Sequence, residues 1–311
     1  MELTDRLLAG DMRALARLIS LVERDDPEVP ALLSELQPRT GHSYLIGVTG
    51  PPGSGKSTLV DTLIEVVRRA GKTVGVVAVD PNSPFTGGAV LGDRVRMQRH
   101  AMDPGVYVRS MGARGHLGGL SGATRHVAKI LDAYGRDYIV VETVGVGQSE
   151  LEVSGLCDST VVVVNPSQGD EIQAIKAGIL EIADLFVVNK ADLPGADRAV
   201  RQLQATYPDD MREGDWLPPI LKTVAAKGEG VEAVLAEIER HRAHVLATGL
   251  LEEKRRRRLR DEVLDMVAER ARRRAERALS NGSALGRELA ETPLRDLDPY
   301  AIARELMEIR Q

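Results

Sequence analysis

The sequence predicts an α/β fold with a mostly parallel central sheet and helical extensions at both ends of the chain. Three observations carry this prediction. Short apolar runs alternate with helical patterns between residues 44 and 188. These runs are continuously apolar, which is typical of strands buried on both faces of a parallel sheet. A glycine-rich loop of the form G-x-x-x-x-G-K-[ST] follows the first of them.

The composition is that of an ordinary globular protein. The 311 residues are 43% hydrophobic and 28% charged, with a net charge of -5, which argues against a membrane span and against a basic nucleic-acid binder. Cys157 is the only cysteine, so neither an intramolecular disulfide nor a thiolate metal cluster can form within one chain. Acidic residues near the N-terminus do not fit a secretory signal, and we expect a cytoplasmic protein. A transit peptide already removed would leave no trace in this chain.

The N-terminal residues 1–40 are predicted to form a helical extension. Apolar residues recur at spacings of three and four over residues 4–23, which predicts one amphipathic helix. A second apolar segment, Val29 to Leu36, ends before Pro38. We expect this extension to pack on a larger domain rather than to have a core of its own.

Residues 41–245 are predicted to form a nucleotide-binding domain. Its expected strands are residues 44–48, 74–79, 138–141, 159–164 and 185–188. In an open parallel sheet the ligand binds at the carboxyl ends of the strands, and the site is therefore expected there.

The C-terminal residues 246–311 are predicted to be helical and highly charged, with helices over residues 252–279 and 299–309. The basic run 254–260 has acidic neighbours and no aromatic residues for base stacking, so we interpret it as a solvated helix face rather than a nucleic-acid patch. His241 and His244 lack a third ligand nearby, and we expect surface residues rather than a zinc pair.

The phosphate loop lies directly after a predicted strand and before a predicted helix, residues 58–70. In such a loop backbone N–H groups surround phosphate oxygens, Lys56 reaches the β- and γ-phosphates, and the Ser57 hydroxyl binds Mg²⁺. The predicted phosphate-binding residues are Gly50, Pro51, Pro52, Gly53, Ser54, Gly55, Lys56, Ser57 and Thr58.

A guanine-reading motif, Asn189-Lys190-Ala191-Asp192, follows the last predicted strand. The Asp192 carboxylate can accept hydrogen bonds from both N1–H and the exocyclic amine of guanine, and adenine cannot satisfy it. Farther along, Ala225, Ala226 and Lys227 occupy the place of the loop whose backbone closes over the base. We therefore predict GTP and GDP as the bound nucleotides.

A switch element is predicted where residues 138–141 end. Glu142-Thr143-Val144-Gly145 has the D-x-x-G form with glutamate in place of aspartate, so its carboxylate would hold Mg²⁺ through water and the Gly145 N–H would sense the γ-phosphate. Asp80 and Asp93 offer further carboxylates.

The water-orienting glutamine that follows the switch glycine in small GTPases is replaced here by Val146, which predicts slow intrinsic hydrolysis. Three candidates remain for the group that accelerates hydrolysis: Gln148, a residue of a partner, or an arginine of the stretch Arg109 to Arg125. We expect that stretch to be flexible.

Together these segments resemble one family, the methylmalonyl-CoA mutase-associated GTPases. This family belongs to the group of P-loop GTPases with glutamate in the switch motif and was formerly described as lysine/arginine/ornithine transport system kinases. The resemblance covers residues 40–230. Besides the phosphate loop it rests on residues 80–84, 87–94, 114–120, 142–150 and 189–192. It implies a P-loop G domain and GTP hydrolysis.

The resemblance also implies a role and a set of site residues. The role is that of a G-protein chaperone that gates loading or release of adenosylcobalamin on a mutase and protects that mutase, with a homodimer formed through the C-terminal helices. Methylmalonyl-CoA, isobutyryl-CoA and ethylmalonyl-CoA mutases are all possible clients. Residues 167–176 correspond to an extra switch that faces the mutase. The implied Mg²⁺ residues are Ser57, Asp80, Asp93 and Glu142, and the implied catalytic residues are Lys56, Glu142 and Asp93.

Two alternatives remain from the residues alone. A metallochaperone GTPase that delivers nickel would share the core, but it needs cysteine and histidine ligands, and the six histidines here are scattered. A P-loop kinase would need an acceptor pocket, for which the sequence gives no sign.

Overall fold

The computed structural model describes residues 2–80, 98–112, 122–143, 149–166, 181–207, 214–280, 282–293 and 297–308. The chain divides into two compact units, Met1–Leu251 and Glu252–Gln311. Each unit is described here by itself.

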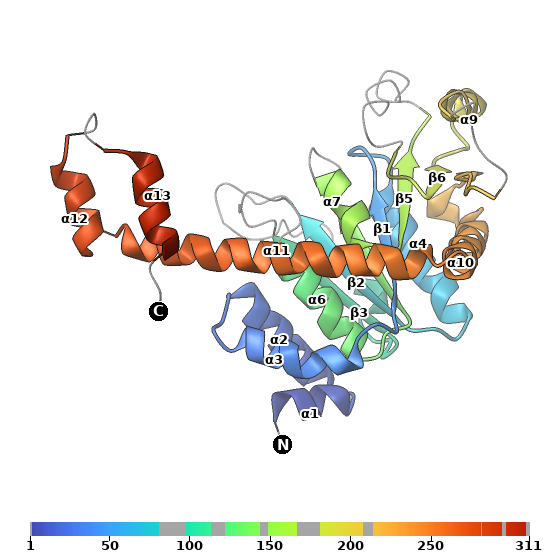
Figure 1. Cartoon of the computed structure of the whole chain (residues 1–311). Coiled ribbons are helices and arrows are strands. Elements are labelled where there is room, and N and C mark those ends of the chain that lie inside the picture. Colours follow the sequence, from blue (N-terminus) through green and yellow to red (C-terminus); the bar gives the residue numbers. More distant parts are fainter. Residues whose placement is uncertain are drawn as a thin grey trace. The chain divides into compact units, whose positions relative to one another are not determined.

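The first unit is built on a parallel sheet, as predicted (Figure 1). Within the described residues seven strands pair in the order β3-β2-β4-β1-β5-β6-β7, and every pair is parallel. The strands are β1 Tyr44–Thr49, β2 Val74–Asp80, β3 Val106–Gly112, β4 Tyr138–Thr143, β5 Ser159–Val164, β6 Leu185–Val188 and β7 Ile220–Lys222. Because all strands run the same way, their carboxyl ends share one edge, called the carboxyl edge below, and their starts share the amino edge.

Helices cover both faces of this sheet. They are α1 Leu3–Leu8, α2 Met12–Glu23, α3 Val29–Leu36, α4 Lys56–Arg69, α6 Gly122–Ala133, α7 Ser149–Leu156, α9 Ala196–Gln204 and α10 Val231–Ala247, with short 3₁₀ turns η1 Gln37–Arg39, η2 Gln98–His100 and η3 Ala225–Lys227. Side chains of α4 and α10 share one core with alternate residues of the central strands. The intervening strand residues pack against α1, α2, α3, α6 and α7, and against α9 in a smaller cluster. Burial on both faces explains why the strand sequences are continuously apolar.

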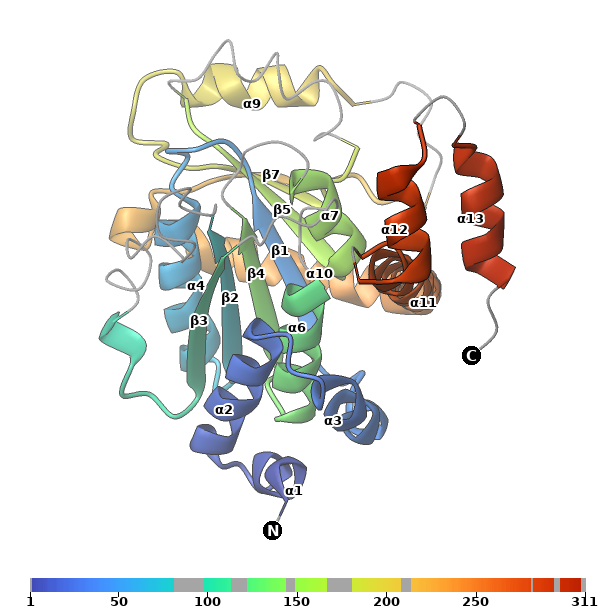
Figure 2. The same cartoon turned by 90° about the vertical axis from the view of Figure 1, so that its left-hand side faces the viewer.

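The N-terminal extension differs from the single predicted helix over residues 4–23, which was wrong. The helix is interrupted at Gly10, whose φ of 84° is unfavourable for other residues. A second helix, α2, begins after Asp11. The Asp11 carboxylate caps this second helix by accepting hydrogen bonds from the backbone N–H of Arg13 and Ala14, at 2.8 and 3.3 Å. Leu15 and other apolar residues of the extension join the core shared with α6. Figure 2 shows α2 beside α6.

The stretch predicted to be flexible from Arg109 begins instead as ordered structure. Residues 109–112 complete strand β3, and the Arg109 guanidinium forms an ion pair with Glu23 of α2. This strand was missed because β3 pairs only with β2 among the described strands and carries the polar residues Arg109 and Ser110, so its sequence lacks a continuous apolar run. Residues 113–121 lie outside the described part of the chain.

The second unit consists of helices. α11 spans Leu250–Ala278, bridging the end of the first unit and the start of the second, followed by α12 Ala284–Glu291 and α13 Pro299–Glu308. The basic run is a solvated face, as predicted, with i,i+4 ion pairs from Arg256 to Glu252 and from Arg257 to Glu253. Apolar side chains of α11 are also exposed, namely Leu259, Val263, Leu264, Met266 and Val267. Across the described residues of both units, no helix has the length and apolar character needed to cross a membrane.

Candidate nucleotide site

The phosphate loop joins the end of β1 to the start of α4, at the carboxyl edge of the sheet. Two of its glycines have no room for a side chain. A Cβ atom at Gly50 would lie 2.0 Å from the carbonyl oxygen of Val163, and one at Gly55 would lie 2.3 Å from Nδ2 of Asn189. Both residues also have positive φ, 135° and 92°. The motif glycines are therefore required by the turn itself, and the N-terminus of α4 points its N–H groups toward this edge.

Lys56 is held within the loop. Its Nζ donates hydrogen bonds to the carbonyl oxygens of Gly50 and Pro51, at 2.7 and 3.0 Å, and the side chain is buried. The ammonium group is thus fixed beside the backbone that would surround phosphate oxygens. A buried cation in this place suits a strongly anionic ligand.

Oxygen ligands converge next to the loop. The Ser57 hydroxyl donates to Oε1 of Glu142 at 2.6 Å, and Glu142 lies on β4, which pairs with β1. Asp80 ends the next strand, β2, so its backbone reaches the same edge. Hydroxyl and carboxylate oxygens are the ligands that Mg²⁺ prefers, and the residues present therefore fit this ion.

Asn189 connects the guanine motif to two other segments. Its Oδ1 accepts hydrogen bonds from the Thr223 hydroxyl and from the backbone N–H of Ala225, both at 3.1 Å, and its Nδ2 donates to the carbonyl of Ser54 at 3.0 Å. Lys190 adopts a left-handed backbone conformation, with φ of 56°, and its Nζ donates to the carbonyl of Gly53 at 2.8 Å. The phosphate loop and the base-binding segments therefore form one connected unit.

Asp192 lies beside the loop that was predicted to close over the base. Its Oδ2 is 3.2 Å from Nζ of Lys227 in η3, and both side chains are partly open to solvent. The structure thus brings together residues from three distant stretches of sequence, 50–58, 189–192 and 225–227. A partly open carboxylate beside backbone N–H groups can recognise a base that presents both donors and an acceptor.

Several predicted residues lie outside the described part of the chain. These are Asp93, Gly145, Val146, Gln148 and the segment 167–176. Their roles stay predictions.

The prediction that His241 is a surface residue was wrong. His241 is 1% exposed, with Nδ1 2.6 Å from the Ser159 hydroxyl and Nε2 3.2 Å from Oδ1 of Asp184. The Tyr44 hydroxyl lies 2.7 Å from the Ser159 hydroxyl, and burial raises the pKa of Tyr44. These groups lie at the amino edge, so they take no part in the nucleotide site. The helical spacing of His241 and His244 gave no sign of a partner so distant in sequence.

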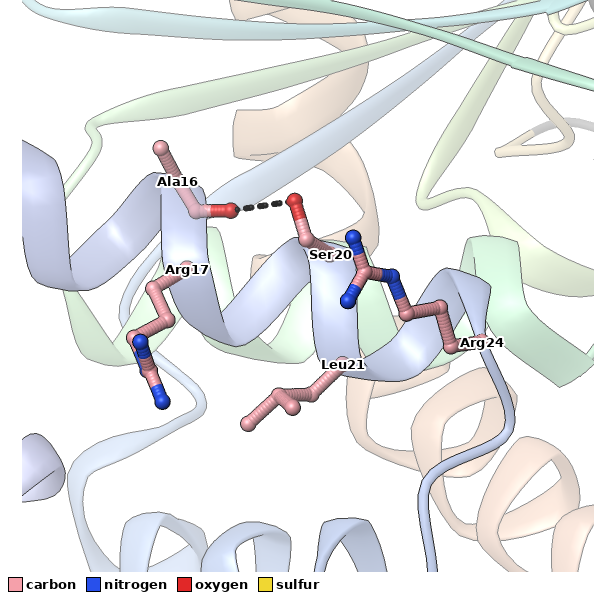
Figure 3. Close-up of a pocket in the computed structure, with 5 residues that line it drawn as sticks. All are labelled: Ala16, Arg17, Ser20, Leu21 and Arg24. Atoms are coloured by element: carbon pink, nitrogen blue, oxygen red, sulfur yellow. Dashed lines mark hydrogen bonds between the residues drawn. The ribbon is translucent and has the colours of Figure 1, made fainter.

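A separate hollow of ≈ 320 Å³ lies along α2 (Figure 3). Its lining residues are Ala16, Arg17, Ser20, Leu21 and Arg24. The Ser20 hydroxyl donates to the carbonyl of Ala16 at 2.9 Å, a bond within the helix. None of these residues contributes to the carboxyl edge. Among the described residues there is also no cluster of three or more histidine, cysteine or acidic side chains suited to a metal ion.

Comparisons with known proteins show what this chain is similar to. The family described as methylmalonyl-CoA mutase-associated GTPase MeaB matches residues 15–280. A putative GTPase of Pyrococcus horikoshii is 48% identical over 310 residues, which cover 99% of this chain and 97% of that protein. GTPase ArgK of Escherichia coli is 36% identical, with 80% of this chain and 78% of the relative covered.

One further relative and one solved structure are also similar to this chain. The mitochondrial methylmalonic aciduria type A homolog of Mus musculus is 35% identical over 80% of this chain and 64% of its own length. The crystal structure of an LAO/AO transport system kinase superposes with a TM-score of 0.69 at 28% identity, covering 98% of this chain and 95% of the other. The family match spans most of the chain, and the relatives from Pyrococcus horikoshii and Escherichia coli are GTPases by name. This chain is therefore a member of the methylmalonyl-CoA mutase-associated GTPase family and has the P-loop GTPase fold.

Proposed function

We propose that this GTPase acts as a chaperone of an adenosylcobalamin-dependent acyl-CoA mutase, with methylmalonyl-CoA mutase as the first candidate. One observation supports the nucleotide half of the proposal: Asn189 joins the phosphate loop to the proposed base-binding loop, so that one connected unit would bind both phosphate and base. The client half rests on the family, which is named for its association with methylmalonyl-CoA mutase, and on the name of the mouse relative.

The chemistry follows from the residues at the carboxyl edge. Lys56 would contact the β- and γ-phosphates, and Ser57, Glu142, Asp80 and Asp93 would hold Mg²⁺ directly or through water. When bound with GTP, this ion supplies positive charge to the phosphate oxygens on which negative charge builds up. Lys56, Glu142 and Asp93 are the proposed catalytic residues.

Val146 follows the switch glycine and cannot orient a water molecule, so hydrolysis is expected to be slow without a partner. Slow turnover suits a nucleotide-dependent signal to a client, with residues 167–176 as the proposed contact.

A homodimer is proposed through the C-terminal region, residues 246–311. Leu259, Val263, Met266 and Val267 of α11 recur at spacings of four, seven and eight, which places them on one face of the helix. All four are at least half exposed. A second copy of the same helix would remove this apolar stripe from water. The proposal keeps residues 1–40 as an extension, residues 41–245 as the GTPase domain and a cytoplasmic location.

The experiment is a binding assay with purified mutases. Each candidate mutase is mixed with the GTPase in the presence of GDP, or of a non-hydrolysable GTP analogue with Mg²⁺, and the complex is quantified by size-exclusion chromatography with light scattering. We expect a complex whose affinity differs between the two nucleotides, together with faster GTP hydrolysis when the client is present. Phosphate release and cofactor transfer to the mutase are measured in the same mixtures.

Lys56→Ala serves as the control, because it removes the phosphate contact and leaves the surface that would face the client intact. This variant should lose the nucleotide dependence of the complex. If none of the three acyl-CoA mutases binds in either nucleotide state, the chaperone proposal is wrong, although GTP binding itself could still be measured.

A further inference from the structure

Thr62 of α4 lies outside every motif found in the sequence, yet it contacts the base-binding loop. Its side chain is 7% exposed, and its hydroxyl donates to the carbonyl oxygen of Ala225 at 2.9 Å. The same hydroxyl lies 3.0 Å from the carbonyl of Thr58 in the preceding turn. This contact links the helix that begins at the phosphate loop to η3.

The bond to Ala225 fixes one particular peptide plane. The carbonyl of Ala225 and the N–H of Ala226 belong to the same planar trans peptide, so they point in opposite directions. Holding the carbonyl against α4 therefore directs the Ala226 N–H away from α4. The Gly228 N–H also donates to this carbonyl, at 3.1 Å, which closes the turn but does not connect it to α4.

The three N–H groups of η3 have different partners. The Ala225 N–H donates to Oδ1 of Asn189 at 3.1 Å, and the Lys227 N–H donates to the carbonyl of Val224 at 2.8 Å. Among the described residues the Ala226 N–H has no hydrogen-bond acceptor, and Ala226 is exposed. It is thus the donor in this loop that is available to a ligand, on the loop that also carries the Lys227 partner of Asp192.

We propose that Thr62 is a positioning residue that aims the Ala226 N–H at the 6-oxo group of guanine. The inference rests on the proposed binding of guanine nucleotides at this site. Adenine carries an amino group at the same ring position, and two donors facing each other leave both unpaired. Thr62 would then act on base selection from the oxo side, while Asp192 acts from the side of N1 and the 2-amino group.

The test compares Thr62→Val with the unchanged protein. Isothermal titration calorimetry measures the affinity of each protein for nucleoside diphosphates that carry three different bases. Valine keeps the shape of threonine and removes the hydroxyl. We expect GDP and inosine diphosphate, which both carry the 6-oxo group, to bind three- to tenfold more weakly, which is about the effect of one hydrogen bond. The diphosphate of 2-aminopurine riboside lacks that oxo group, and its affinity should not change.

Two variants serve as controls. Thr62→Ser restores a hydroxyl and should recover most of the affinity for GDP. Thr4→Val removes a similarly buried hydroxyl from α1, which packs against α2 and α3, and should leave all three affinities unchanged. The amide resonance of Ala226, followed by NMR, should shift on GDP binding in the unchanged protein and shift less in Thr62→Val.

An equal loss of affinity for all three nucleoside diphosphates would mean that Thr62 only stabilises the fold. Unchanged GDP affinity would mean that the contact has no effect on nucleotide binding. Either result overturns the inference. If the unchanged protein binds no guanine nucleotide, the proposed function itself fails. The two failures are therefore distinguishable.

Discussion

The two edges of the sheet use polar side chains in opposite ways. At the carboxyl edge, Lys56, Asn189 and Lys190 bond mainly to loop backbone, and Asp192 remains partly open to solvent. At the amino edge, Tyr44, Ser159 and His241 bond to one another and are almost wholly buried.

Ser159, His241 and Asp184 are ordered like a nucleophile, a base and the group that orients it. Ser159 has no exposed surface, and Tyr44 covers its hydroxyl, so no substrate can reach this group. The comparison teaches that access, and not hydrogen-bond geometry alone, separates a reactive site from a structural network. The two edges should therefore respond differently to mutation: one in ligand binding, the other in stability.

The largest expected effect is on base selection at the carboxyl edge. Asp192→Asn replaces a carboxylate that is proposed to accept two hydrogen bonds from guanine with an amide that cannot accept both, so GDP affinity should fall by about 10³-fold or more. The amide can instead donate to the 2-oxo group of xanthine, and xanthosine diphosphate should gain affinity. Calorimetry with both nucleotides measures this exchange.

The melting temperature of Asp192→Asn should stay within about 2 °C, because an ion pair with Lys227 at an exposed position contributes little. Unchanged GDP affinity would show that Asp192 does not contact the base.

The second effect is on stability at the amino edge. His241→Ala removes a hydrogen-bond partner from Ser159 and a close polar contact from Asp184, and it opens a cavity beside Trp216, whose ring centre lies 4.8 Å from that of His241. We expect the free energy of unfolding to fall by about 3 kcal/mol, measured by urea denaturation. GDP affinity of the folded protein should be unchanged.

His244→Ala is the matched control, since His244 lies on the same helix and beside the same tryptophan but is only partly buried. It should cost less than about 1 kcal/mol. A loss of GDP binding in His241→Ala without loss of stability would contradict the division between the two edges.

A smaller effect depends on pH and again belongs to the amino edge. Hydrogen bonds from the Arg68 guanidinium hold the pKa of Asp103 below its ordinary value. A lowered pKa in the folded state means that this carboxylate stabilises the protein above the unfolded pKa of about 3.9 and that the stabilisation is lost as pH falls through the folded value. Asp103→Asn should therefore cost about 1.5 kcal/mol at pH 7 and progressively less below pH 4.

Thermal unfolding of Asp103→Asn and of the unchanged protein between pH 2.5 and 7 measures this difference. The nucleotide-free protein is used, so that ligand titration does not contribute. A difference in stability that stays constant over the whole range would refute the assignment to the Asp103 carboxylate.

The sequence was sufficient for elements whose signal is local. The strands Ser159–Val164 and Leu185–Val188 were predicted with their observed limits because they are continuously apolar. The phosphate loop could be predicted because its glycines are required by the backbone turn itself.

Elements that depend on distant partners could not be predicted. β3 carries Arg109, whose partner Glu23 is far away in sequence, and the contact of Thr62 with Ala225 spans 163 positions. The prediction for His241 was wrong for the same reason. The helical spacing of His241 and His244 carries no information about a buried serine on a distant strand.

Arg136 gives the smallest effect and the sharpest test of how completely the amino edge is satisfied. Its side chain is 5% exposed, its guanidinium carbon lies 4.9 Å from the ring centre of Tyr134, and Nε and Nη2 have no hydrogen-bond partner among the described residues. Burial accordingly lowers the pKa of Arg136. Unpaired buried donors on a charged group destabilise the protein by more than the contact with one aromatic ring stabilises it.

Arg136→Met keeps the length of the side chain and removes both the buried charge and its unpaired donors. It should therefore stabilise the protein by about 1 kcal/mol and raise the melting temperature by about 2–4 °C. Arg136→Lys keeps the charge, loses the planar contact and should lower the melting temperature. If Arg136→Met is destabilising instead, a bound water must satisfy these donors, and the amino edge is then as fully hydrogen-bonded around Arg136 as it is around His241.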